Sequence, residues 1–164
     1  VLVPSPMFNI FYTFGHAFFH FMINGLGLRQ LCDVAVLLHR YHDDIDVKEF
    51  ESCLRTYKLD REWKLFVSLL VNHLGLPAEK ALLYEGRPAR LTDKLLETVL
   101  DDGNFGQNKS RPAHQHRPVI LKKAGSLINH HVLFLSRFKF SHRQTLRHYF
   151  HLWYIGFFAF VHEV

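Results

Sequence analysis

The chain has 164 residues, a length typical of a single domain that can bury a core of useful size. Apolar residues make up 48% and charged residues 21%, a balance that excludes an intrinsically disordered chain. The formal net charge is +5, but Lys and Arg are dispersed and interrupted by acidic pairs such as Asp43 and Asp44. This charge pattern argues against a dedicated nucleic-acid-binding domain, which gathers its cations on one face.

Two helices are predicted at the start, over residues 7–24 and 28–42, with a glycine-containing link between them. Gly25 and Gly27 are placed to stop the first helix. The second helix carries apolar residues on several faces, Val36 among them. We therefore expect it to lie at the centre of the fold, surrounded by other helices.

Capping signals mark the next two predicted helices. Asp46, with Glu49 three residues later, resembles a capping box that opens a helix through Tyr57. Asp60 can cap the following helix, and Gly75 can end it. A proline two residues further on can begin a short helical turn.

The remaining sequence predicts more helices on either side of a loop. One helix runs from Leu91 to near Gly103, and another follows a Ser141–Gln144 capping box. No stretch alternates with period two for long enough to predict a strand. The fold class is therefore all-α, an irregular bundle of about six to seven helices. We expect a single helical domain over residues 1–164, divided into core helices at 1–103, a loop at 104–118 and carboxyl-terminal helices at 119–164.

Apolar runs at both ends raise the question of a membrane span. The runs from Phe8 to Ile23 and from Phe150 to Val161 contain histidines and fall short of the ~20 apolar residues that a crossing needs. We predict buried helices and no membrane span. Cys32 and Cys53 lie among apolar residues outside any metal-type spacing, which predicts buried free thiols and a cytoplasmic location.

His16 and His20 are four residues apart, so a helix places both on one face. Such a pair can chelate zinc, but the glutamate of the zinc-protease motif is absent, because Ala17 to Phe19 fill the gap. Three interpretations stay open: a structural pair at a helix interface, a contact to a ligand or phosphate, and a metal site. The spacing of this pair alone does not assign a metal to it.

Arg29 and Asp33 share the same spacing on the second predicted helix. Asp33 stands among apolar residues, so we expect a buried carboxylate that is paired with Arg29 or a histidine. One interpretation is a structural ion pair between the first two helices. The other uses Arg29 as a fork for phosphate oxygens, with Asp33 orienting it.

Complete catalytic machinery is not recognisable in this sequence. Asp44 and Asp46 have the spacing of a metal-binding carboxylate pair, but they precede a helix and suit a cap. The turn from Gly103 to Gly106 lacks the Lys and Ser or Thr of a phosphate-binding loop.

The stretch from His16 to His20, followed by the run from Gly25 to Asp33, resembles an uncharacterised bacterial nucleotidyltransferase family. Ile45 with Asp46, the segment from Leu74 to Pro77, and the turn from Gly103 to Gly106 add to the resemblance in the same order. It covers about residues 4–108, and it concerns the carboxyl-terminal helical region of that family.

The resemblance implies a two-part protein. An amino-terminal α/β domain carries a Gly-Ser turn and metal-binding carboxylates, and helices follow it. The present chain is similar only to the helices, as a fragment would be, so it is expected to be inactive alone and to hold no cofactor itself. Mg²⁺ and a nucleoside triphosphate are expected for a complete parent. The candidate site residues carried over are His16, His20, Arg29 and Asp33.

A different class of function stays open beside this one. The sequence contains 16 Phe, many of them near the two ends. Such ends could pack against a missing or separate nucleotidyltransferase domain, or form a homodimer, and the chain would then be a structural or interaction module.

Overall fold

The computed structural model describes residues 3–23, 25–86, 89–103 and 131–162. Every secondary-structure element in these residues is helical, so the predicted all-α fold is confirmed. The chain divides into two compact units, Val1–Ser110 and Arg111–Val164. The predicted loop at 104–118 and the Asn104 to Gly106 part of the predicted turn lie outside the described residues.

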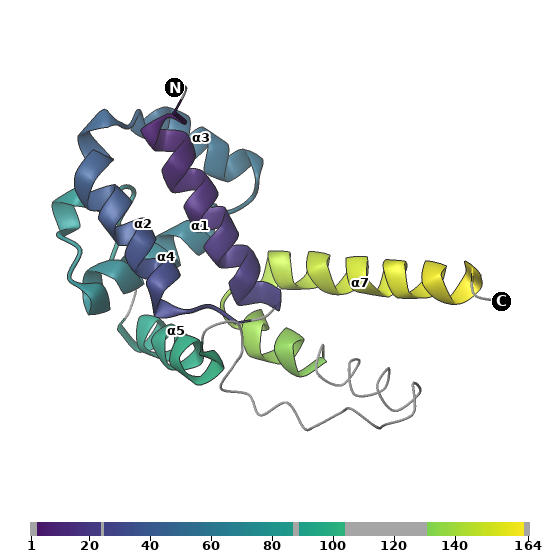
Figure 1. Ribbon diagram of the computed structural model, residues 1–164. Coiled ribbons are helices and arrows are strands. Elements are labelled where there is room, and N and C mark those ends of the chain that lie inside the picture. The colour runs from purple at the N-terminus through teal and green to yellow at the C-terminus, as the bar shows by residue number, and fades with distance from the viewer. Residues whose placement is uncertain (1–2, 24, 87–88, 104–130, 163–164) are drawn as a thin grey trace. The chain divides into compact units, whose positions relative to one another are not determined.

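Helices α1 (Pro6–Ile23) and α2 (Leu28–Tyr41) pack against each other, and a short link joins them (Figure 1). Gly25 has a φ of 98°, which favours glycine, and its N–H donates to the His20 carbonyl at 2.9 Å. Gly27 has an extended backbone and precedes α2, and its N–H donates to the Gln30 side chain at 2.8 Å. Gly25 therefore follows the first helix as predicted, whereas Gly27 opens the second.

A short turn, η1 (His42–Asp44), leads to α3 (Val47–Thr56). The Asp46 carboxylate accepts hydrogen bonds from the N–H groups of Lys48 and Glu49 at 2.9 and 3.1 Å, which confirms its predicted role as a helix cap. The predicted cap at Asp60 is wrong. Helix α4 (Asp60–Leu74) already includes Asp60 in its first turn, with Leu59 at the capping position.

The predicted end of α4 at Gly75 is confirmed. Gly75 has the left-handed φ of 73°, and its N–H donates to the Leu70 carbonyl. The turn η2 (Ala78–Lys80) follows Pro77 as predicted, and α5 (Ala89–Asp102) ends before Gly103. Local sequence signals therefore set most of the boundaries in this unit.

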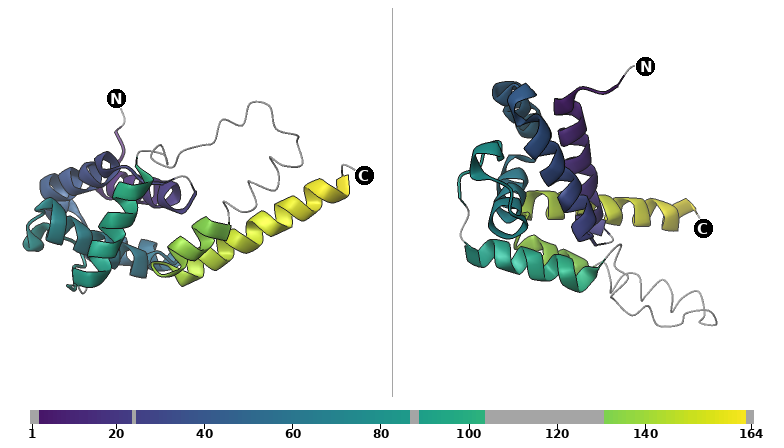
Figure 2. Two further views of the ribbon diagram at one scale, coloured as in Figure 1. Left: turned by 90° about the horizontal axis from the view of Figure 1, so that it is seen from below. Right: turned by 60° about the vertical axis from the view of Figure 1, so that its left-hand side comes forward.

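The core of the first unit is built around α4, which contacts α2, α3 and α5 (Figure 2). Phe66 on α4 packs edge-on against three α1 side chains. The prediction that α2 is the central helix is wrong. Helix α2 buries only Leu31, Val34 and Leu38, whereas α4 buries every residue from Leu65 to Leu70. A helix that is apolar on all sides must be covered on all sides, and α4 fits that description better than α2 does.

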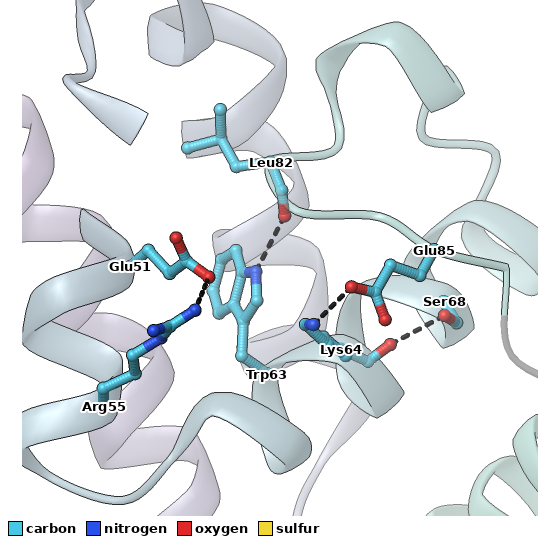
Figure 3. Close-up of polar contacts among 7 residues, drawn as sticks. All are labelled: Glu51, Arg55, Trp63, Lys64, Ser68, Leu82 and Glu85. Carbon is cyan, nitrogen blue, oxygen red and sulfur yellow. Dashed lines mark hydrogen bonds and ion pairs between the residues drawn. The ribbon is translucent and has the colours of Figure 1, made fainter. Parts of the chain in front are cut away.

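Trp63 joins three parts of this core. Its ring makes edge contacts with Phe14 of α1 and Phe50 of α3, at centroid distances of 5.0 and 4.7 Å. Its indole N–H donates to the Leu82 carbonyl at 2.8 Å (Figure 3). The next residue of the helix, Lys64, pairs with Glu85. These two contacts fasten the segment that follows η2 onto α4.

In the second unit, residues 131–138 are helical and α7 (His142–His162) follows Ser141. Phe134 packs on Tyr149 at 4.5 Å, and the Tyr149 hydroxyl lies 2.9 Å from Nε2 of His131. The two helical stretches therefore pack on each other across the turn at residues 139–141. The predicted start of α7 near Ser141 is confirmed, and most of the helix predicted at residues 119–134 lies outside the described residues. None of the described helices is long and apolar enough to cross a bilayer.

Candidate functional site

One face of α1 carries a column of rings at intervals of four residues, and the first three of them are exposed. Phe8 stacks on Tyr12, and Tyr12 stacks on His16, each pair with centroids 6.0 Å apart. Phe8, Tyr12 and the nearby Phe19 are 52%, 60% and 56% exposed, although other aromatic side chains of α1 are buried in the core. This column, Phe8–Tyr12–His16–His20, is called the α1 ring column below.

The two histidines of the α1 ring column contact each other directly. Nε2 of His16 and Nε2 of His20 lie 3.1 Å apart, and the ring planes are nearly perpendicular. One Nε2 must carry the proton and donate it while the other accepts, because two protonated nitrogens would repel each other. His16 is exposed and His20 is half-buried, so the pair is open to solvent on one side.

Burial lowers the pKa of His20 below its usual range, and the neighbouring His16 lowers it further. The charged imidazolium is disfavoured by the loss of water around it and by a second positive ring beside it. His20 is therefore held in the neutral form more strongly than an imidazole in the unfolded chain.

This pKa shift predicts a loss of stability in mild acid. The unfolded chain binds the His20 proton more tightly, so the stabilising contribution is complete above about pH 6.5 and decreases as the pH falls toward the lower folded-state pKa. We expect the free energy of unfolding to fall less between pH 7 and pH 5 in His20→Gln than in the wild-type chain. Urea titrations at each pH measure this difference, with His39→Gln, at an exposed position of α2, as the control. Parallel pH profiles for wild type and His20→Gln would contradict the prediction.

Arg29 and Asp33 are both exposed on α2. The expectation that Asp33 is a buried carboxylate is therefore wrong. Among the described residues no ion pair links Arg29 to Asp33, or either of them to His16 or His20. The reason is the orientation of α2: its Leu31, Val34 and Leu38 face the core, so positions 29 and 33 fall on the opposite side. The structure brings the two histidines into contact and leaves Arg29 and Asp33 available to solvent.

Because Asp33 is exposed and forms no ion pair among the described residues, we expect Asp33→Asn to change the free energy of unfolding by less than about 0.5 kcal/mol. Urea denaturation followed by circular dichroism measures this. A loss of several kcal/mol would show that Asp33 is a structural residue.

Cys32, next to Asp33, is exposed and Cys53 is half-buried, and both are free thiols. The prediction of free thiols is confirmed, and the prediction that both are buried is wrong. The exposed face of α2 explains Cys32 in the same way as it explains Asp33.

Asp44 and Asp46, which have the spacing of a metal-binding carboxylate pair, are not part of a larger group of metal-binding side chains among the described residues. Within these ranges no group of three or more His, Cys, Asp or Glu side chains comes together. Asp46 uses its carboxylate as the cap of α3, and Asp44 lies exposed in η1.

Comparison with protein families bears on the resemblance seen in the sequence. Residues 1–75 match the model of a family described as "Uncharacterised nucleotidyltransferase". No curated protein and no solved structure matches the chain. The matched region ends at Gly75, the residue that ends α4, and it contains His16, His20, Arg29 and Asp33. The resemblance to this nucleotidyltransferase family is therefore confirmed for α1 to α4.

The spacing of His16 and His20 predicts their shared face, whereas the rest of the α1 ring column was not predicted. The signal was present, because Phe8, Tyr12, His16 and His20 recur at the four-residue interval of one helix face. The apolar run predicts a buried helix, whereas Phe8, Tyr12 and Phe19 of α1 are exposed.

Proposed function

We propose that this chain is the helical part of a nucleotidyltransferase-like protein and that the exposed faces of α1 and α2 contact a nucleotide or its phosphates. The observation that carries the proposal is the family match over residues 1–75, which contains all four candidate side chains. The transfer step itself belongs to a domain with a Gly-Ser turn and paired Asp residues, which supplies the Mg²⁺ site. On this proposal the chain alone is inactive, and the whole protein uses a nucleoside triphosphate.

Arg29 is the side chain best suited to the phosphate contact. It is exposed in the first turn of α2, and no ion pair among the described residues occupies its guanidinium group. A planar guanidinium donates two parallel hydrogen bonds to phosphate oxygens. The backbone N–H groups at the start of α2 add partial positive charge beside it.

The histidine pair supplies a second kind of contact. One imidazole nitrogen can donate to a phosphate oxygen when the His16–His20 contact opens, and His16 is exposed enough to do so. The free thiols Cys32 and Cys53 support action in a reducing compartment, the cytoplasm.

The first test is the coding sequence upstream of Val1, where the proposal expects a Gly-Ser turn followed by paired Asp residues. The longer protein is then titrated with a nucleoside triphosphate and Mg²⁺ in a calorimeter. Arg29→Ala is expected to weaken binding by roughly ten- to a hundredfold, the value of a charge-assisted hydrogen bond.

Arg40→Ala is the matched control, because Arg40 is exposed on the same helix about 16 Å further along. It is expected to leave nucleotide binding unchanged. Undetectable binding by the longer protein, or equal binding by wild type and Arg29→Ala, would rule the proposal out.

A second candidate function is supported by the α1 ring column. Exposed aromatic side chains in such number on one helix are typical of a surface that another protein covers. The chain would then be an interaction module that binds a nucleotidyltransferase domain or a second copy of itself. Light scattering after gel filtration tests the homodimer: a dimer that Tyr12→Ser disrupts, together with full activity of Arg29→Ala in the longer protein, favours this function.

A further inference from the structure

We propose that His16 and His20 form a two-imidazole chelate for a divalent ion of the Zn²⁺ class on the open side of α1. The two Nε2 atoms lie 3.1 Å apart, and imidazole nitrogen is a preferred ligand of Zn²⁺, Cu²⁺ and Ni²⁺. This site does not depend on the nucleotide proposal. Both ligands belong to α1, so an ion can bind them without a nucleotide or a further domain.

The distance between the two nitrogens fits a shared ion. With metal–nitrogen bonds of about 2.0–2.1 Å, nitrogens at this spacing subtend an angle of roughly 95–100° at the ion. That value lies between the angle of about 90° in square-planar or octahedral sites and the angle of about 109° in tetrahedral sites. The distance between the two nitrogens is therefore compatible with either kind of ion.

Neighbouring aromatic rings contact both histidines of the pair. Tyr12 stacks on the His16 ring at 6.0 Å and Phe19 contacts the His20 ring edge-on at the same distance. These contacts limit the rotation of both rings and reduce the entropy lost when an ion binds.

The site is open on its outer side. His16 is exposed, and within the described residues no third His, Cys, Asp or Glu completes a metal-binding group. Water would occupy the other coordination positions of a bound ion, and an anionic oxygen could replace it. The ligand class that such an ion would accept is a carboxylate or phosphate.

The test is a calorimetric titration of the full chain with ZnCl₂ at slightly alkaline pH. The chain has 13 His, so several weak sites can contribute, and the comparison is between variants. His16→Ala is expected to remove one site or to weaken it by roughly a hundredfold, since losing even an outer-shell partner costs ten- to a hundredfold. Because His16 is exposed, this variant keeps the fold, and His20→Gln should have the same effect on the site.

His73→Ala and His42→Ala are the controls, because each of these histidines lies beside a single carboxylate, at 3.0 and 3.2 Å. They are expected to leave the site intact. A second measurement is thermal unfolding, in which Zn²⁺ should raise the Tm of wild type more than that of His16→Ala. Equal Zn²⁺ binding by wild type and His16→Ala, no binding by wild type, or loss of the site only in a control variant would each overturn the proposal.

Discussion

Trp63→Ala is expected to lower the free energy of unfolding by about 3–5 kcal/mol, the typical loss when a buried tryptophan is truncated in a core. The Trp63 side chain is 1% exposed, and it contacts Phe14 and Phe50 from two other helices. A loss of this size is a large share of the stability of a typical domain, about 5–15 kcal/mol. Urea denaturation followed by far-UV circular dichroism measures it without depending on tryptophan fluorescence.

Trp63→Phe separates the hydrogen bond from the packing. Phenylalanine keeps much of the apolar surface but cannot donate to the Leu82 carbonyl, so we expect a smaller loss of about 1–3 kcal/mol. Val36→Ala, at a position of α2 that is 64% exposed, is the control and should change stability by less than about 0.5 kcal/mol. If Trp63→Ala were no more harmful than Val36→Ala, the central place of α4 in the core would be wrong.

The same substitution is expected to have opposite effects at two glycines. Gly75 ends α4 with a φ of 73°, and an added Cβ would meet no atom within 4 Å. The cost of Gly75→Ala is therefore a backbone cost alone, about 1–2 kcal/mol for a left-handed residue. Urea denaturation of the variant measures it.

Gly15 is the matched position inside α1, and a Cβ there also meets no atom within 4 Å. In a helix interior alanine is preferred over glycine, so Gly15→Ala should stabilise the chain by about 0.5–1 kcal/mol. The difference in sign depends only on backbone conformation, because neither site is crowded. A shift in the same direction for both variants would show that one of the two glycines has been assigned the wrong conformation.

Two signals that act over about one helical turn predict the structure correctly, although the cap expected at Asp60 does not. The cap at Asp46 and the stop at Gly75 depend on residues within five positions of each other, so a short stretch contains all the information. The contact between His16 and His20 belongs to the same class, since both side chains are on one helix and the spacing fixes their shared face.

Features that depend on packing between helices were not predictable in the same way. Val36 is apolar but 64% exposed, and Asp33 is flanked by apolar neighbours but faces solvent. Which face of α2 is covered depends on where α4 packs against it. The spacing of residues within α2 does not reveal the position of α4. The signal for α4 was nevertheless available, because Leu65 and Leu69 add apolar residues outside the stripe formed by Trp63, Phe66 and Leu70.

The contacts of Trp63 also bear on how the first unit can be divided. Its partners come from α1, α3 and the segment after η2, three stretches that are far apart in the sequence. A shortened chain that begins after α1 would lose Phe14, Phe18 and Phe21 and uncover the aromatic faces of α4. Such a truncation would expose an apolar surface and promote aggregation. Expression of this unit should therefore retain the first helix.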